Sequence, residues 1–245
     1  MQRCKLALAL LATTTLLASA CVSSDEDTSI LILQNQLPTA ECGPQTDPSA
    51  PFLPRGLVDT NSPNGYVLSP IVQNSASTVD STVSQLYLFE GADIDLTPQS
   101  GFFSEEQLAA LNADNQLSFS QRFSGIIMPD GGVTMMIFEI MSKSLLDTIG
   151  ATLPTDGTVL QVKAEIQVFG QMHGGGLKSQ KFTYWVDVCN GCLTANNLGS
   201  CSAIPTGFVA GQGSCFGLQD AELDCCTDDD TGAVICPATA GSTGS

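Results

Sequence analysis

The sequence has little positive charge and almost no histidine. It contains 25 Asp and Glu residues against 8 Lys and Arg residues, and His173 is its single histidine. Such an acidic chain repels nucleic acid, so we expect no nucleic-acid partner. A Ser-His-Asp or Cys-His catalytic arrangement would have to use His173, which precedes three glycines in an expected hairpin tip. We interpret His173 as an exposed loop residue.

The sequence also lacks other signatures of enzymes. No serine stands in a G-x-S-x-G motif, and no internal repeat is visible. We therefore expect no catalytic residue, no cofactor and no enzymatic activity. The alternative is a polysaccharide hydrolase with paired carboxylates, for which the candidates are Asp93, Asp95, Glu90 and Glu139. Asp93 and Asp95 would share one face of a strand, about 6.6 Å apart at twice the rise per residue.

The apolar stretch at the N-terminus is too short to cross a membrane as a stable helix. Two basic residues precede this stretch, which covers 6–17, and the segment Leu-Ala-Ser-Ala-Cys then ends at Cys21. This order is typical of a secretory signal peptide, here spanning 1–20. The last segment also resembles the lipobox of bacterial lipoproteins, which implies that Cys21 receives a diacylglycerol group. Ordinary secretion after cleavage at Ala20 is the alternative.

Residues 21–29 are polar and acidic, and we expect them to form a flexible tether. In lipoproteins of Gram-negative bacteria, an Asp directly after the lipidated cysteine favours the inner membrane, whereas this chain has Val22. The resemblance therefore implies a cell-envelope protein held to the outer membrane by its N-terminal lipid. Its partner in the envelope would be another protein or a glycan.

Eight cysteines follow Cys21, and seven of them lie beyond residue 188. They are Cys42, Cys189, Cys192, Cys201, Cys215, Cys225, Cys226 and Cys236. An even number in an exported chain favours four disulfides, although the sequence does not fix the pairing. We expect one bridge to join Cys42 to the C-terminal region. The adjacent Cys225 and Cys226 should bond to different partners, because a bridge between neighbours is strained.

Two features of the cysteine-rich region leave room for metal binding. The Cys189-Asn-Gly-Cys192 spacing also occurs in zinc and redox sites, but a zinc site would need a second pair or histidines. A redox pair usually opens a helix, whereas this one ends a predicted strand, so a structural disulfide is favoured. The carboxylates of Asp224, Asp228, Asp229 and Asp230 are typical of calcium ligands. Without EF-hand spacing, we interpret them as a solvated acidic turn and predict no metal.

Apolar and polar residues alternate with period two over much of 30–192, as expected for strands with one buried face. The alternation is clearest over 159–169 and 181–188, which we predict to form an antiparallel hairpin. Further strands are predicted over 30–37, 66–73, 83–96, 117–123 and 133–140. A capping-box pattern beginning at Ser104 and a second apolar stripe from 142 to 149 predict two short helices.

These elements predict an all-β fold. We expect an antiparallel β-sandwich of about seven strands over 30–192, with barrel closure as the alternative. Residues 193–236 show no sustained periodicity, so they should form an irregular appendage stapled by disulfides. Residues 237–245 should form a disordered tail.

Trp185 is the strongest candidate for a binding residue. Its position in the alternation places it opposite Tyr184 and Val186, hence on an outer face. An exposed aromatic ring can mark a binding patch, which favours a glycan-binding or adhesive module. The alternative is that the C-terminal region covers this face.

The layout resembles uncharacterised lipoproteins of the myxobacterial type, with a lipobox, an acidic tether, a β-rich body and a multi-cysteine tail. The residues that carry the likeness are ILQNQ at 32–36, KFTY at 181–184 and VCNGC at 188–192. The resemblance implies no activity and no site residues. We therefore expect a lipid-anchored envelope protein with a non-catalytic binding or structural role.

Overall fold

The computed structural model describes residues 29–39, 42–77, 85–195, 198–204, 215–232 and 234–235. In this part of the chain the fold is all-β, as predicted, and α2 (Glu105–Ala113) and α3 (Lys143–Gly150) are its two α-helices. Neither helix is long and apolar enough to cross a membrane. Cys21, Cys236, the predicted signal peptide over 1–20 and the tail predicted over 237–245 lie outside the described residues.

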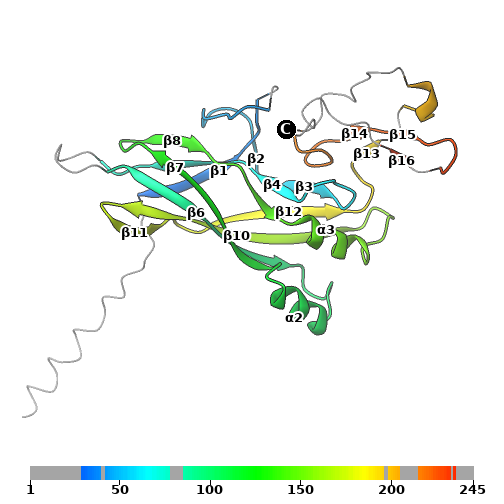
Figure 1. Ribbon diagram of the computed structural model, residues 1–245, viewed down its shortest axis with the longest axis horizontal. Coiled ribbons are helices and arrows are strands. Elements are labelled where there is room, and N and C mark those ends of the chain that lie inside the picture. Colours follow the sequence, from blue (N-terminus) through cyan, green and yellow to red (C-terminus); the bar gives the residue numbers. More distant parts are fainter. Residues whose placement is uncertain are drawn as a thin grey trace, which may run out of the picture.

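The largest sheet has six strands and contains the predicted hairpin (Figure 1). Its order is β3 (Gly56–Asp59), β12 (Phe182–Cys189), β10 (Val159–Met172), β6 (Tyr87–Pro98) and β7 (Ser118–Ile127), with β11 (Gly175–Lys178) also paired to β10. Neighbouring strands are antiparallel except β3, which runs parallel to β12. The expectation of purely antiparallel pairing is wrong at this edge. No hairpin links β3 to β12, so the turn geometry does not fix their relative direction.

A four-stranded sheet and three smaller pairs complete the fold. The order in the four-stranded sheet is β2 (Phe52–Leu53), β1 (Ile30–Gln36), β5 (Pro70–Asn74) and β8 (Gly132–Met135). The pairs are β4 (Tyr66–Leu68) with β9 (Phe138–Met141), β13 (Thr194–Ala195) with β14 (Leu223–Asp224), and β15 (Cys226–Thr227) with β16 (Val234–Ile235).

The described residues thus form more strands than the seven predicted, several of them only two to four residues long. The strand predicted over 66–73 breaks at Ser69, whose N–H donates to the Asn35 side chain and whose carbonyl accepts from Gln36 N. Both bonds of Ser69 go to β1, the partner of β5, whereas the residues just before Ser69 form β4 and pair with β9. The two halves of the predicted strand therefore join different partners that lie far away in the sequence.

One apolar core joins the sheets and α3. It contains Val162 and Ile166 from β10, Val72 from β5, Ile140 from β9 and Leu145 from α3, all fully buried. Along β10 every second residue is buried and the others are partly exposed, which is the predicted alternation. A second, smaller cluster of Leu193, Leu218, Leu223 and Cys225 lies in the C-terminal region and packs against Leu57 of β3.

Local signals placed several elements correctly. Ser104 accepts from Gln107 N while the Gln107 side chain accepts from Ser104 N, which completes the predicted capping box of α2. His173 lies at a hairpin tip, as predicted. His173 and Gly174 have positive φ angles of 55° and 76°, the backbone that a two-residue hairpin turn between β10 and β11 requires.

The described residues contain three of the four predicted disulfides. Cys42 bonds to Cys215 across 173 residues, so the predicted bridge from the N-terminal segment to the C-terminal region is present. Cys226 bonds to Cys201 and therefore not to its neighbour Cys225, which is itself disulfide-bonded. The third described pair is Cys189 and Cys192, which bond to each other.

A buried polar network fixes the segment before β14 against the sheets. Asp220 accepts from Leu57 N at 2.7 Å and from the Tyr66 hydroxyl at 3.1 Å. The Tyr66 and Tyr184 hydroxyls lie 3.2 Å apart, and Asn35 donates to Tyr184 at 2.8 Å. These side chains come from four distant parts of the chain, so the network joins the C-terminal region to both large sheets.

All three tyrosines are buried, which predicts a steep loss of stability in alkali. Burial raises the pKa of Tyr184 to about 12 and raises those of Tyr66 and Tyr87 well above the usual value. A raised pKa in the folded state leaves the stability intact below about pH 10, where unfolded tyrosine is protonated. Stability is then lost as the pH rises from about 10 through 12, by about 1.4 kcal/mol per pH unit for each tyrosine.

Absorbance titration of tyrosinate tests this expectation, with circular dichroism recorded in parallel. We expect no tyrosine to ionise with a pKa near 10 in the folded protein, and ionisation to accompany unfolding. A native-state titration of one or more tyrosines near pH 10 would contradict the burial of these rings.

Candidate functional site

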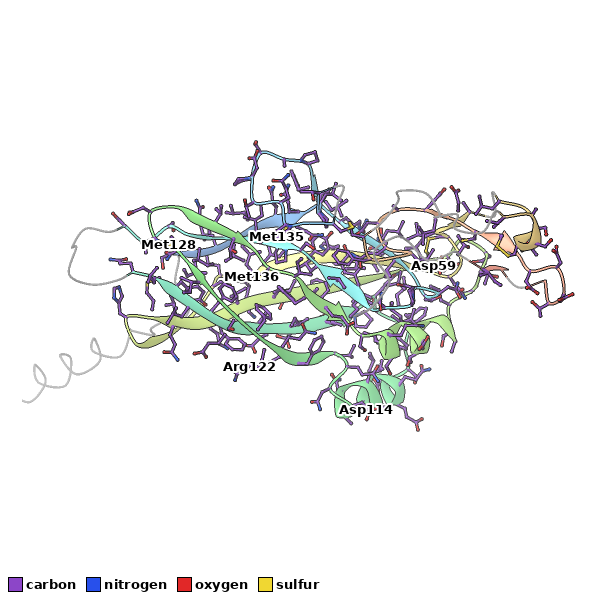
Figure 2. The ribbon with its side chains drawn as sticks, turned by 45° about the horizontal axis from the view of Figure 1, so that its top comes forward. Asp59, Asp114, Arg122, Met128, Met135 and Met136 are labelled. Atoms are coloured by element: carbon purple, nitrogen blue, oxygen red, sulfur yellow. A yellow bond between two sulfur atoms is a disulfide. The ribbon has the colours of Figure 1, made fainter. Side chains whose placement is uncertain are left out.

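The outer sheet face is the side of the six-stranded sheet turned away from the core, where Figure 2 shows Arg122 on the opposite side of the strands from the buried Met136. Beyond residue 20 the chain has six basic residues, and five of them contact carboxylates of this face. The ion pairs are Arg55–Asp187 at 3.1 Å, Arg122–Glu90 at 3.7 Å, Lys163–Glu165 at 3.0 Å, Lys181–Glu165 at 3.8 Å and Lys178–Asp93 at 2.9 Å. The sixth basic residue is Lys143 of α3.

The charges on this face balance although the chain as a whole is strongly acidic. With Asp95, the strands carry five carboxylates on the outer sheet face against its five cations. Among the described residues, 15 further carboxylates lie off this face, and Lys143 is the one basic residue among them that is not on it. The outer sheet face is therefore close to neutral within a surface that is otherwise negative.

A β-bulge at Glu90 shapes one end of this face. The register of β6 shifts between Phe89 and Gly91 against β7, and the register of β10 shifts at the same level. The bulge leaves Glu90 without a directly paired residue, and such bulges redirect a side chain. The Glu90 carboxylate accepts from Gln171 Nε2 at 2.6 Å and pairs with Arg122.

Phe169 lies beneath this cluster. A Cβ at Gly91 would lie 2.6 Å from Phe169 Cζ, so glycine is needed where the ring crosses β6. The Arg122 guanidinium lies 4.9 Å from the ring centroid, within the range of a cation–π contact. The β10–β11 hairpin contributes Gly174 and Leu177 as a wall, and the result is an open groove of about 550 Å³.

The charged groups in the groove are paired with one another. Asp93 accepts from Ser120 Oγ at 2.6 Å and from Lys178 Nζ at 2.9 Å. Partial burial raises the pKa of Asp93, but the hydrogen bonds and the charges of Lys178 and Arg122 outweigh it, so that the pKa is lowered overall. Asp93 is therefore ionised at neutral pH and has no proton to donate.

The carboxylates proposed for a hydrolase do not form one site. Asp93 and Asp95 share the outer sheet face, as predicted, and Asp95 accepts from Ser118. Glu139 belongs to β9, which lies on the core side of β7 because Phe138 stacks on Phe123. Burial raises the pKa of Glu139, partly offset by a hydrogen bond from Gly65 N.

Trp185 lies on the outer sheet face and is 42% exposed, as its position in the alternation predicted. It pairs across β12 and β10 with Lys163. Phe169 lies six residues after Lys163 on the same side of β10. At about 3.3 Å per residue, the rings of Trp185 and Phe169 are therefore about 20 Å apart along the strand. The C-terminal region does not cover Trp185 in the part of the chain that the structure describes.

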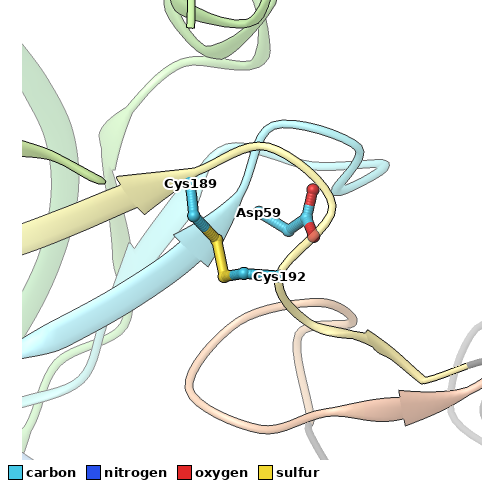
Figure 3. A group of neighbouring side chains, drawn as sticks. All are labelled: Asp59, Cys189 and Cys192. Atoms are coloured by element: carbon cyan, nitrogen blue, oxygen red, sulfur yellow. A yellow bond between two sulfur atoms is a disulfide. The ribbon is translucent and has the colours of Figure 1, made fainter. Parts of the chain in front are cut away.

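A buried carboxylate that the sequence did not reveal lies beside the Cys189–Cys192 disulfide (Figure 3). Asp59 is fully buried at the end of β3. Its Oδ1 accepts from Asn61 N and Nδ2 and from Gly191 N, and its Oδ2 accepts from Leu193 N. Asp59 therefore holds both its own turn and the loop that the disulfide closes.

Asp59 and the Cys189–Cys192 pair do not suit a metal ion while the two cysteines are joined as a disulfide. The ligand-type atoms of Asp59, Cys189 and Cys192 lie within 4.8 Å of one another. The two sulfur atoms are bonded to each other, however, and four N–H groups already donate to the carboxylate. A cysteine binds zinc as a free thiolate, which neither sulfur of a disulfide provides. The pair is therefore present as the structural disulfide that was predicted.

The acidic residues before β16 act in a local turn. Asp228 Oδ1 accepts from Asp230 N and from the N–H and hydroxyl of Thr231, and these bonds lower the pKa of Asp228. Asp229 accepts from Ser200. The carboxylates are exposed and serve turn hydrogen bonds, which agrees with a solvated acidic turn.

Comparisons with protein-family models, with curated proteins and with solved structures gave no match. The candidate site is therefore defined by this chain's own geometry. It consists of the groove above the Glu90 bulge and the neutral face that extends from it to Trp185.

Proposed function

We propose that this chain is a lipid-anchored protein of the cell envelope with a non-catalytic binding role, and that the outer sheet face is its contact surface. The observation that carries the proposal is the groove, in which Glu90, Asp93, Arg122 and Lys178 pair with one another. A general acid needs a raised pKa and a general base needs access to the substrate proton. Paired, ionised groups around an aromatic ring are suited instead to hold a ligand.

The cysteines support an exported protein. Seven cysteines are disulfide-bonded in the described residues, and such bonds persist in oxidising compartments such as the bacterial periplasm and cell surface. The lipobox-like segment ending at Cys21 supplies an anchor in such a compartment. Three acyl chains on this cysteine would bind a membrane stably, because dual acylation already does.

Replacing Cys21 with serine is expected to release the protein from the membrane. The intact protein expressed in a Gram-negative bacterium should be recovered in the membrane fraction, with a mass that includes the acyl chains. C21S has no thiol to acylate and should be recovered in the soluble fraction or remain uncleaved. C4S is the matched control, because Cys4 lies inside the signal peptide and its loss should leave the anchoring unchanged. A wild-type chain that carries no acyl group and partitions into the membrane to the same extent as C21S would contradict the proposed lipid anchor.

The binding role is separated from catalysis by incubating the purified protein with envelope polysaccharides. We expect no change in their chain length or reducing ends. A clear turnover that D93A abolishes would replace the binding role with the hydrolase alternative.

A further inference from the structure

We infer that the outer sheet face binds a neutral, hydroxyl-rich glycan chain, which lies along β10 from the Glu90 groove to Trp185. The inference rests on the proposed binding function and adds the class of ligand. It combines three independent observations, namely the local charge balance, the alternation of hydrogen-bonding groups and the two aromatic rings.

The charge balance selects a neutral occupant. Five cations and five carboxylates share this face, while 15 further carboxylates of the described residues lie off it. A polyanion would be repelled by the molecule as a whole, and a cationic partner would be drawn to the unpaired carboxylates on other surfaces. A neutral ligand is neither repelled by the acidic molecule nor drawn to its other surfaces. It also need not break the ion pairs of this face to bind.

Hydrogen-bonding groups alternate along the face in a way that suits hydroxyl groups. The outer side of β10 presents in succession the donor Lys163, the acceptor Glu165 and the amide of Gln167. Lys163 pairs with Glu165 and Gln167 donates to Ser179 O, so these groups are held in place with hydrogen-bonding capacity to spare. Across the strands, Asp93 and Asp95 lie opposite Ser120 and Ser118. A sugar hydroxyl both donates and accepts, and its bonds to ionised side chains are stronger than neutral ones.

The aromatic rings mark the two ends of the face. Trp185 is 42% exposed at one end, and Phe169 lines the groove at the other, where the Arg122 guanidinium lies over part of its ring. The C–H faces of sugar rings pack on aromatic rings, which supply large contact areas at small entropic cost. A span of about 20 Å between the rings requires an extended chain of several sugar units, because a single sugar could contact only one end.

Trp185 is the chain's single tryptophan, so its fluorescence reports directly on this face. Detergent-solubilised full-length protein is titrated with cellohexaose and maltohexaose, with polygalacturonate as the anionic comparison and glucose as the short one. We expect a saturable change with a neutral hexasaccharide and a much weaker response to glucose and to polygalacturonate.

Two variants and one control locate the binding. R122Q and F169A should each weaken hexasaccharide binding about tenfold, as expected when an arginine or aromatic contact that contributes much of the binding energy is removed. Arg122 is highly exposed, so R122Q tests the groove even if F169A fails to fold. K143Q alters the one cation outside this face and should leave the affinity unchanged.

Three results would overturn the inference. They are tighter binding of polygalacturonate, equal responses to glucose and the hexasaccharides, and no response to either neutral hexasaccharide. None of these results affects the membrane partition of C21S, so failure of the glycan inference is distinguishable from failure of the anchored envelope protein.

Discussion

Replacing Asp59 with alanine is expected to lower the free energy of unfolding by about 3–5 kcal/mol. The carboxylate is fully buried and accepts four hydrogen bonds from Asn61, Gly191 and Leu193. Each buried donor left without a partner costs about 1–3 kcal/mol, and Leu193 N lies in the interior. Urea unfolding followed by circular dichroism gives the difference.

A matched exposed carboxylate controls for the loss of turn hydrogen bonds. Asp156 accepts from the N–H and hydroxyl of Thr158 in the same local arrangement, but it is exposed to solvent. D156A should cost about 1 kcal/mol or less, because water satisfies the released groups. Equal losses in D59A and D156A would show that burial of Asp59 contributes nothing.

Removing the Cys42–Cys215 bridge by replacing both cysteines with serine should cost about 5 kcal/mol, the second large effect. The bond closes a loop across 173 residues, and loop-closure entropy in the unfolded chain rises with loop length. The Cys189–Cys192 bond spans three residues and should contribute only about 2 kcal/mol by the same reasoning.

The comparison between the two double variants is the informative quantity. Both remove one bond and two sulfur atoms, so the difference of about 3 kcal/mol reports mainly on loop length. If C189S/C192S is the more destabilised of the two, the short bridge contributes through the Asp59 loop rather than through chain entropy. Thermal or urea unfolding without reductant measures both.

Signals confined to a few neighbouring residues allowed much of the fold to be predicted. The capping box at Ser104, the alternation along β10 and the glycine after His173 each act within one turn or one strand, so the sequence displays them directly. The exposed position of Trp185 followed from the same alternation. The bridge from Cys42 followed from counting, because the other cysteines lie far along the chain.

The features that could not be predicted, the buried Asp59 and the bulge at Glu90, depend on contacts between residues that are distant in the sequence. Asp59 lies 132 residues before its partner Gly191, and nothing in its neighbourhood marks it as a buried acceptor. The bulge at Glu90 depends on register against two strands at once. The sequence therefore offered Asp93 and Glu90 as carboxylates without revealing that Arg122, Lys178 and Phe169 meet them.

The position of the Cys42–Cys215 bond also determines how the molecule carries mechanical load. A force applied between the two chain ends passes through this covalent bond and bypasses every residue from 43 to 214. The strands that form the outer sheet face, β3 to β12, all lie within that closed ring. Strand β1 lies outside the ring on the N-terminal side, as β14, β15 and β16 do on the C-terminal side, and these are the described strands that a pull would reach. Tension on the chain ends would therefore be limited to the flanking segments, and the contact surface would keep its shape under a pull.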